Sequence, residues 1–546
     1  MLRWLGISSL VLLILAAGAI EILLRSVEPV LRARVIQSLS TRFDARVELG
    51  EFHVSFLRGF ETVGTNLAIY PRGLPANRPI LSVGRFSFRT DYFDLLRSPL
   101  RIGMVEVDRL QVHVPPRSAR AGGAISGGPG SPADPPASAA GRGTGLGLSV
   151  DRIRCANAVL TIDTDKPGKA PETFAIKRFV LISLAPGKPL RFTATLTNPK
   201  PVGDIQSSGY FGPWNSRDPG STALAGDYSF QHANLGSLRG IAGTLSSQGR
   251  YRGTLDTLVV DGSTDTPDFE IKLSGRPVPL HTEFHAIVDG LTGDTYLQPV
   301  KAWFLHSSFV ATGKVVRSPE TPGHQIDLEV AVDQARIEDL LALAVRATPA
   351  LLTGAVRMRA NLDIPPGPGN VAKKLNLNGK FDLWDAHFSN AKIQADVDRL
   401  SLRSQGNPGR AARLKSNPQS GGIASEMQGD FRLTNGLLTL ANLNYTVPGT
   451  IIRLNGEYRQ DGSSLNLTGT ADLQATVSQM VGGWKGLLLK PFDHYLEKNG
   501  AGAEVPFRIT GTTAAPQVSL DFHRKSPPGA GPNPQGTGHP PQPERP

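Results

Sequence analysis

Three residues that can bind metal ions alternate along one short stretch of the chain: His281, Glu283 and His285. Side chains two positions apart on a β-strand point to the same side, so all three would share one face. Imidazole and carboxylate groups are zinc ligands. Metalloproteases instead carry two histidines on a helix with a glutamate directly after the first, an order that HTEFH does not have. We therefore expect a solvated strand face here and no metal site.

The other short motifs do not form a catalytic centre. Gly141–Gly147 lies in a low-complexity stretch without a preceding strand, and Thr312-Gly313-Lys314 lacks the flanking residues of a phosphate-binding loop. Cys155 is the only cysteine, which excludes an internal disulfide and a thiolate metal cluster. The sequence thus predicts no catalytic residue, no cofactor and no metal, and we expect a protein that is not an enzyme. A hydrolase of envelope polymers is the weakest alternative.

The composition is typical of many strands and turns. The 546 residues include 59 glycines and 43 prolines, which suits an all-β protein and argues against a helical bundle. The formal net charge is +11, and a basic surface near a membrane can contact anionic lipid headgroups. The sequence has no RNA-binding aromatic motif and no zinc-finger spacing, so we expect no nucleic-acid partner.

The amino terminus predicts export from the cytoplasm. An uncharged run extends from Trp4 to Ile20, and apolar residues resume after Glu21. Since about 20 apolar residues span a bilayer, we expect an uncleaved transmembrane helix. A cleaved signal peptide is the alternative, because Ala17-Gly18-Ala19 has small residues at the spacing of a cleavage site. The residues expected to anchor the chain in the membrane are Trp4, Leu10, Leu13, Leu15 and Ile20.

After the leader, the period of the apolar residues changes from helical to extended. Leu31, Val35, Ile36 and Leu39 predict an amphipathic helix within 28–41, which either lies on the membrane surface or packs on the first strand. From Val47 onward apolar and polar residues alternate, as in half-buried strands. Two of these series slip by one residue midway, which indicates β-bulges. They are Val47, Leu49, Phe52, Val54, Phe56 and Val105, Val107, Leu110, Val112, Val114.

Turn signals recur through the rest of the chain and predict a long antiparallel meander. Asp-Gly and Asn-Gly pairs favour tight hairpins because both residues accept positive φ. They occur at Asp261-Gly262, Asp289-Gly290, Asn435-Gly436 and Asn455-Gly456. Helical patterns are few, and we expect short helices at 337–345 and 477–489, with low-complexity breaks at 365–370 and 404–422.

These patterns divide the chain into six segments. They are a transmembrane anchor (1–27), an N-terminal β segment with its leading amphipathic helix (28–114), a disordered linker rich in Gly, Pro and Ala (115–148), a central β repeat region (149–425), a C-terminal region (426–525) and a disordered Pro-rich tail (526–546).

Two of these regions resemble AsmA-like proteins of Gram-negative envelopes, the AsmA/TamB type. The first is 31–70, where a helix after the leader runs into a first strand. The second begins with Phe431-Arg-Leu-Thr-Asn-Gly-Leu-Leu-Thr-Leu and closes with Val505-Pro-Phe-Arg-Ile-Thr-Gly-Thr-Thr-Ala-Ala-Pro516, and it is similar to the family's C-terminal region. Residues 151–425 match only in their strand–turn repeats, such as Gly249-Arg-Tyr-Arg-Gly253.

The resemblance implies a mostly β fold with a long, curved, open antiparallel sheet that forms a half-tube with an apolar groove. It also implies a single-pass inner-membrane protein with its bulk in the periplasm, which takes part in phospholipid transport to the outer membrane or in assembly of that membrane. Candidate lining residues of the groove are Leu433, Leu437, Leu465 and Leu467. Two alternatives stay open: these leucines fill an ordinary sandwich core, or the protein is a scaffold that recruits envelope proteins through exposed sheet edges.

Overall fold

The structure is a computed structural model of the whole chain. It describes residues 28–520, except for 42, 56–59, 72–77, 91–99, 117–147, 164–170, 185–188, 214–217, 239, 273, 291, 319–320, 322, 345–348, 370, 414–421, 460–462, 482–501 and 513–515. The fold is mostly β with few helices, as the sequence predicts. The chain forms two compact units, and Ala395–Ser425 together with the residues from Leu437 onward make up unit 2.

Unit 1 holds most of the strands. They are β1 (Ala45–Glu48), β2 (Phe52–Ser55), β3 (Phe60–Pro71), β4 (Leu81–Thr90), β5 (Leu100–Val114), β6 (Leu148–Ile162), β7 (Glu172–Leu184), β8 (Leu190–Pro199), β9 (Val202–Phe211), β10 (Ala223–Asn234), β11 (Ile241–Ala242), β12 (Thr244–Thr254), β13 (Thr257–Ile271), β14 (Arg276–Asp289), β15 (Thr295–Phe304), β16 (Ser307–Arg317), β17 (His324–Arg336), β18 (Leu352–Ile364), β19 (Asn376–Phe388) and β20 (Ser425–Thr434). The helices of unit 1 are 28–41, α3 (Ile337–Ala344) and α4 (Val371–Lys374), with 3₁₀ turns at Pro219–Ser221 and Leu235–Ser237.

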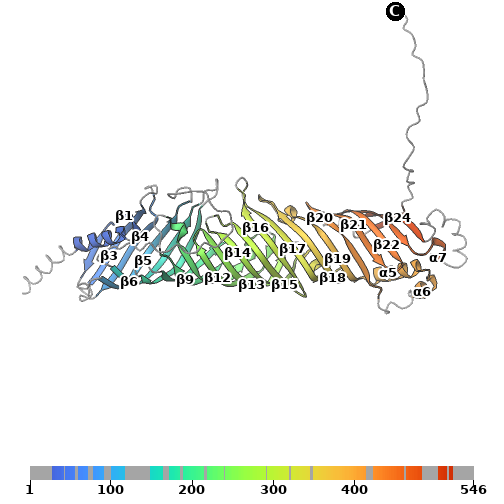
Figure 1. The fold of residues 1–546 in the computed structure, drawn as a ribbon, viewed down its shortest axis with the longest axis horizontal. Helices are drawn as coiled ribbons and strands as arrows, with labels where there is room; N and C mark the ends of the chain where they lie inside the picture. Colours follow the sequence, from blue (N-terminus) through green and yellow to red (C-terminus); the bar gives the residue numbers. More distant parts are fainter. Residues whose placement is uncertain are drawn as a thin grey trace, which may run out of the picture. The chain divides into compact units, whose positions relative to one another are not determined.

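These strands form one open, curved sheet and mostly lie side by side in chain order (Figure 1). The exceptions are β1 and β2, which both pair with β3, and the short β11, which pairs with β13 while β10 pairs directly with β12. Neighbouring strands pair antiparallel, with one exception: β5 and β6 run parallel, from Leu100 opposite Leu148 to Val114 opposite Ile162. The expectation of a purely antiparallel sheet is therefore wrong, and the sheet is mixed. A parallel pair cannot be joined by a tight hairpin and needs a connection of a dozen or more residues. The low-complexity stretch after β5 provides that length, although 117–147 lies outside the described residues.

Register shifts interrupt several strand pairings, for example between Phe230 and Ala233 of β10 and between Val332 and Ala335 of β17. In β5 the pairing register stays constant, but Arg109 has a φ of 55°, and Asn157 of β6, at the matching position, has a φ of 54°. Val107 and Leu110 pack in the same core cluster, so the alternation of the second apolar series does slip here, as predicted. The first series is broken instead into β1 and β2, which both pair with β3, where Asn66 has a φ of 50°. Because each bulge bends and twists its strand, such repeated bulges favour the curvature of the sheet.

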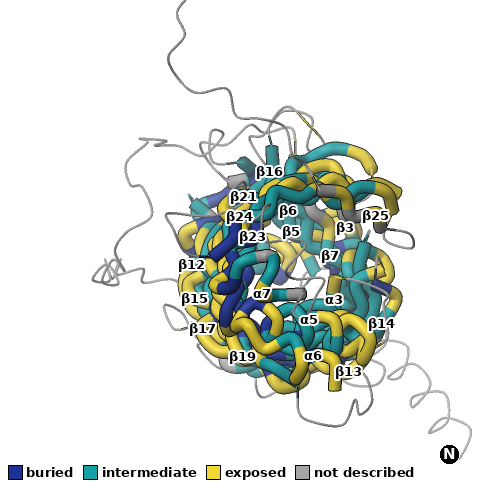
Figure 2. The backbone as a smooth tube through the Cα atoms, turned by 90° about the vertical axis from the view of Figure 1, so that its right-hand side faces the viewer, coloured by how far each residue is buried: buried dark blue, intermediate teal, exposed yellow. Residues whose placement is uncertain are grey.

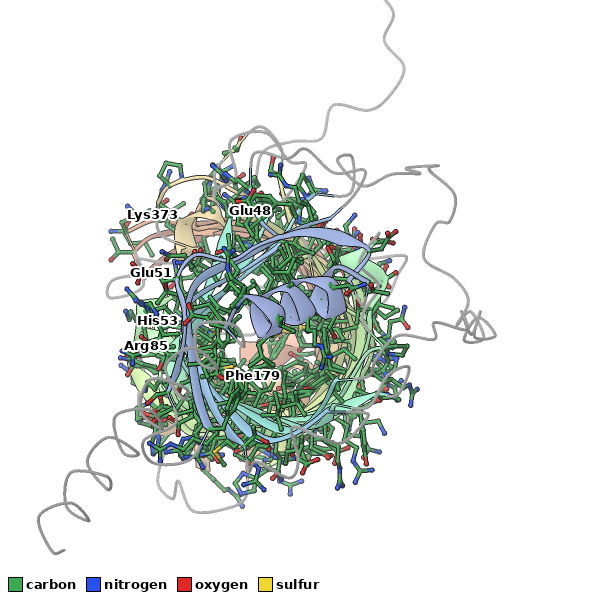
Figure 3. All side chains as sticks on the ribbon, turned by 90° about the vertical axis from the view of Figure 1, so that its left-hand side faces the viewer. Glu48, Glu51, His53, Arg85, Phe179 and Lys373 are labelled. Carbon is green, nitrogen blue, oxygen red and sulfur yellow. The ribbon has the colours of Figure 1, made fainter. Side chains whose placement is uncertain are left out.

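The amphipathic helix 28–41 packs against the sheet of unit 1. Leu31 is buried, and Val35, Ile36 and Leu39 pack on the same cluster as Phe60, Ile69 and Phe86. Arg32 donates from its guanidinium to the carbonyl oxygen of Leu49 at 2.6 Å. Figure 3 shows this helix lying across the inside of the curved sheet at the N-terminal end. The predicted apolar stripe therefore serves core packing.

Two of the four predicted turn pairs lie inside strands. Asp261-Gly262 is in the middle of β13, and Asn455-Gly456 is in the middle of β22 (Thr450–Arg459), so both hairpin predictions are wrong. A Cβ on Gly262 would lie 2.6 Å from the Tyr228 hydroxyl, and one on Gly456 would lie 2.2 Å from the Asn466 carbonyl oxygen. Both glycines thus permit close approach within the sheet. Asp289-Gly290 and Asn435-Gly436 do form turns, the latter with φ values of 52° and 73°.

Unit 2 is a smaller sheet with helices on one face. Its strands are β21 (Leu437–Val447), β22, β23 (Leu465–Leu473), β24 (Ala503–Gly511) and β25 (Pro516–Leu520), which pair antiparallel in chain order. Its helices are most of α5 (Ala391–Ser404), α6 (Pro408–Arg413) and α7 (Val477–Val481). Leu400 of α5 and Met480 of α7 pack with Ala471, Leu473 and Ala503. The helices therefore cover the end of the sheet face that carries Ala471 and Leu473 of β23.

The predicted helices are found as far as they are described. α3 matches 337–345 closely, and α7 begins the helix predicted at 477–489, whose remainder lies outside the described residues. Among the described residues no helix is long and apolar enough to cross a membrane. The predicted anchor 1–27 with Trp4, Leu10, Leu13, Leu15 and Ile20, most of the linker 115–148 and the tail 526–546 all lie outside the described residues.

The packing of helix 28–41 gives a first prediction. Leu31→Ala removes buried apolar contacts worth about 2–3 kcal/mol, so the helix should detach more often. We expect hydrogen exchange of the backbone amides of 28–41, measured by mass spectrometry on the full chain, to speed up about tenfold to a hundredfold. The control is Gln37→Ala at an exposed position of the same helix, which should leave exchange unchanged. Equal exchange in both variants would contradict the packing.

Candidate functional site: the concave face of the sheet

One face of the unit 1 sheet carries an unbroken row of uncharged residues. Cα partners in paired strands present their side chains on the same face, so the register can be followed from strand to strand. We call this set the concave row, because Phe179 points into the interior of the curved sheet while Arg85 and Glu51 point outward (Figure 3). The concave row consists of Gly64, Phe86, Val107, Cys155, Phe179, Ala194, Ser207, Tyr228, Gly249, Gly262, Phe284, Val300, Ala311, Val330, Ala360 and Gly379.

The next row along the same strands faces the other side and is rich in charge. It runs through Ser87, Glu106, Arg154, Val180, Thr193, Ser208, Asp227, Arg250, Asp261 and His285. Its ionisable groups form cross-strand pairs: Arg250 Nε lies 3.1 Å from Asp227 Oδ1, and His285 Nδ1 lies 2.5 Å from Asp261 Oδ1. The two faces therefore differ sharply in polarity.

Much of the concave row is only half-buried. At the N-terminal end helix 28–41 buries Phe86, which is 7% exposed. Beyond it, Phe179, Tyr228, Phe284, Val300 and Val330 are all half-buried. Figure 2 shows the resulting mixture of buried, intermediate and exposed stretches along the strands. The protein's own side chains do not fully cover this apolar surface.

The middle of the row is polar, which departs from the expectation of a uniformly apolar lining. Ser207, Tyr228, Gly249 and Gly262 follow one another there, and Tyr251 lies in the adjacent row on the same face. Tyr251 is hydrogen-bonded to Ser207 at 2.6 Å, and Tyr228 to Ser247 at 3.0 Å. A cavity of about 1110 Å³ borders β10, β12, β13, β14 and β15, and Tyr228, Tyr251 and Phe284 are among its lining residues.

The four leucines predicted to line a groove do not form one cluster. In unit 2, Leu465 and Leu467 are half-buried and share a face, since Leu467 pairs with Ile509 and Leu465 with Gly511. Leu437 pairs with the exposed Arg459, while its neighbour Leu438 pairs with Tyr458, which is the partner of Leu465. Leu437 therefore lies on the opposite face from Leu465 and Leu467.

Leu433 belongs to β20 of unit 1 and is half-buried. It is two residues from Phe431, so the two share a face of the strand. The Phe431 ring lies 6.2 Å from that of Phe381, and Phe381 pairs with Met358. These residues lie beside a buried cluster around Val332, Val356 and Leu383. Leu433 thus lines an apolar surface, and that surface is in a different unit from the other leucines.

Each of the two histidines with metal-ligand chemistry pairs with a carboxylate on the adjacent strand. His281 Nδ1 lies 2.7 Å from Asp265 Oδ1, and His285 pairs with Asp261, both on the adjacent strand β13. The His281 ring also packs against Trp303, with a centroid distance of 5.5 Å. Among the described residues no group of three or more His, Cys, Asp or Glu could hold a metal ion. The alternation on one strand is as predicted, and each imidazole has its own partner.

Cys155 occupies the concave row at a position that is 1% exposed. Burial raises the pKa of its thiol from 9.0 to about 12, so the sulfur stays protonated at neutral pH. Since the thiolate is the nucleophile and the metal ligand, a buried thiol of this kind is inert. Cys155 is a packing residue between Val107 and Phe179.

The sequence also contains a signal for the polar part of the row. Gly226 precedes Tyr228 by two positions, and Gly249 precedes Tyr251 in the same way. Each Gly-x-Tyr places a glycine and a tyrosine on one face of a strand, and adjacent strands bring the two pairs together. From sequence alone Gly249-Arg-Tyr-Arg-Gly253 is recognisable only as a strand–turn repeat, because the pairing of distant strands cannot be derived from it.

No known protein family matches the chain, and neither the curated proteins nor the solved structures include a match to it. The AsmA-like resemblance therefore stays a prediction from the sequence.

The buried thiol predicts a specific pH dependence. Between pH 9 and about 12 the folded chain keeps a proton on Cys155 that the unfolded chain releases, so the free energy of unfolding falls as pH rises through this window. Cys155→Ala lacks this contribution. We expect the difference in unfolding free energy between the native chain and Cys155→Ala, measured by chemical denaturation, to be constant below pH 9 and to decrease by pH 10.5. Parallel profiles for the two proteins would contradict the assignment.

Proposed function

We propose that the protein is a non-catalytic lipid carrier that shields acyl chains on the concave face of its sheet. The observation that supports this most strongly is the contrast between adjacent rows. The concave row has no charged residue from Gly64 to Gly379, whereas the outward row one residue away carries Glu106, Arg154, Asp227, Arg250 and Asp261.

The half-buried state of the row favours a bound apolar ligand. Removing apolar surface from water stabilises by about 0.8 kcal/mol per methylene. An acyl chain lying along Phe284, Val300 and Val330 would cover apolar surface that the protein alone leaves partly hydrated. A sandwich core, the alternative reading, would bury these side chains fully. The partial exposure of the concave row therefore favours a surface that binds a ligand over the core of a β-sandwich.

The proposed ligand and cellular location are drawn from the sequence resemblance to AsmA-like proteins. Phospholipid is the cargo that fits a long apolar surface in a protein resembling AsmA-like proteins, and we place this chain at the inner membrane as a single-pass protein with its bulk in the periplasm. In this proposal it takes part in lipid transport to the outer membrane or in assembly of that membrane. It requires no cofactor and no metal.

A lipid-extraction experiment tests this function. The full chain is purified in a mild detergent and co-purifying lipid is quantified by mass spectrometry. Val300→Asp and Leu467→Asp each place a carboxylate on a half-buried apolar surface, where charge is costly to desolvate. We expect each to lower bound phospholipid several-fold. The matched control is Ile451→Asp, since Ile451 is 41% exposed on the outward face of β22.

Circular dichroism of each variant shows whether the sheet is intact. If the native chain is folded but carries no lipid, the carrier proposal is contradicted. That result would favour the second function, a scaffold that recruits envelope proteins through its sheet edges. Equal lipid loss in Ile451→Asp would show that the effect is general destabilisation.

The membrane anchor is tested separately. We expect the mature chain to retain residues 1–27 and to stay with the membrane fraction after alkaline carbonate extraction, because an uncharged run from Trp4 to Ile20 resists release. Amino-terminal sequencing of the purified protein gives the answer. A chain that starts at Ile20 would replace the anchor with a cleaved leader, and both results are compatible with export.

A further inference from the structure

The polar centre of the concave face has the construction of a ligand subsite. We call it the tyrosine collar, and it consists of Ser207, Gly226, Tyr228, Ser247, Gly249, Tyr251 and Gly262. It spans β9, β10, β12 and β13, and it is followed along the concave row by Phe179 and Ala194 on one side and by Phe284 and Val300 on the other. A polar subsite between two apolar stretches matches an amphiphile with a polar head.

The two tyrosine rings lie flat across neighbouring strands. A Cβ on Gly249 would lie 2.9 Å from Tyr228 Cε1, and one on Gly262 would lie 2.6 Å from the Tyr228 hydroxyl oxygen. Likewise a Cβ on Gly226 would lie 2.9 Å from the Tyr251 hydroxyl oxygen. The Tyr228 ring thus lies over Gly249 and Gly262, and the Tyr251 hydroxyl lies over Gly226, where the neighbouring backbone also leaves no room for a Cβ. Both tyrosine side chains are half-buried.

The hydrogen bonds of the collar fix where its protons go. Ser207 donates its only hydroxyl proton to the carbonyl oxygen of Asp227 at 2.9 Å, and Ser247 donates to that of Ser263 at 2.9 Å. Each serine must therefore accept from its tyrosine, Tyr251 and Tyr228 respectively. Both tyrosine hydroxyl protons are therefore donated to serine oxygens within the protein. The tyrosine hydroxyl oxygens can consequently accept a hydrogen bond from a ligand but cannot donate one to it.

The charge around the collar favours a cationic group. Burial, followed by the charge of Asp227, raises the pKa of Tyr251, so negative charge at its hydroxyl is disfavoured. The charged residues of these strands, such as Asp227, Arg250 and Asp261, belong to the outward row, so the concave row brings no counter-charge to the collar. Uncharged surroundings of this kind suit a net-neutral zwitterion better than an anion.

We propose that the tyrosine collar binds the ammonium of a zwitterionic amine headgroup. This inference rests on the proposed lipid-carrying function. Acceptor-only hydroxyls take the N–H donors of an ammonium, and the faces of aromatic rings attract cations. A headgroup that offers only acceptor oxygens finds no donor among the collar hydroxyls. The collar therefore selects among lipids whose acyl chains the apolar stretches bind equally.

The test is a competition among lipids with identical acyl chains. The full chain in non-ionic detergent is incubated with equal amounts of phosphatidylethanolamine, phosphatidylglycerol and phosphatidic acid, and bound species are counted by native mass spectrometry. We expect about tenfold enrichment of phosphatidylethanolamine over phosphatidic acid. The double variant Tyr228→Phe, Tyr251→Phe removes the acceptor oxygens, so it should lose most of this enrichment while total bound lipid stays the same.

The matched control is Tyr210→Phe, since Tyr210 of β9 is 51% exposed on the outward face and should keep the enrichment. Equal binding of all three lipids by the native chain, or unchanged enrichment in the double variant, would overturn the collar assignment and leave the carrier function standing. If phosphatidylglycerol binds as well as phosphatidylethanolamine, the assignment of an ammonium as the bound group is overturned, and the collar instead binds a headgroup through hydroxyl donors. A native chain that binds none of the three overturns the carrier function itself.

Discussion

The register between neighbouring strands is the constraint on which the molecule depends. A slip of one residue at any pairing would move charged residues such as Asp227 and Arg250 into the interior and turn Tyr228 outward. The uncharged row persists where distortions on adjacent strands lie at matching positions, as at Arg109 and Asn157, where both residues have positive φ and the pairing register stays constant. Positive φ values at these non-glycine residues are costly, and the paired backbone on both sides holds them in place.

How far the fold can be predicted from sequence depends on the range of the interaction. Alternation is local, so the strands, the helix 28–41 and α3 follow directly from residue patterns. The parallel pairing of β5 with β6 is not local, because no residue pattern in either strand specifies its direction. α5 was missed although Asn390 caps it, accepting from the amides of Lys392 and Ile393, because Val397, Leu400 and Leu402 also resemble a strand.

The candidate site likewise combines features that local sequence patterns predict with features that depend on distant strands. Sequence identified Leu465 and Leu467 on one face of a strand, since two-residue spacing is sufficient for that. It could not place Leu437, because a bulge between Leu440 and Leu443 inverts which residues face that side. It read Asp261-Gly262 as a turn, because the ring that requires Gly262 to lack a side chain comes from Tyr228, on a strand far away in the chain.

The glycines of the concave face allow neighbouring backbone and the two tyrosine side chains to come close together. Glycine within a strand costs about 0.5–1 kcal/mol relative to alanine, so Gly226, Gly249 and Gly262 reduce the stability of their strands. Here they let two tyrosines lie against the sheet, and Phe284 and Val300 beside them stay half-buried. The proposed carrier function would account for this half-buried apolar surface, because a bound acyl chain would cover it.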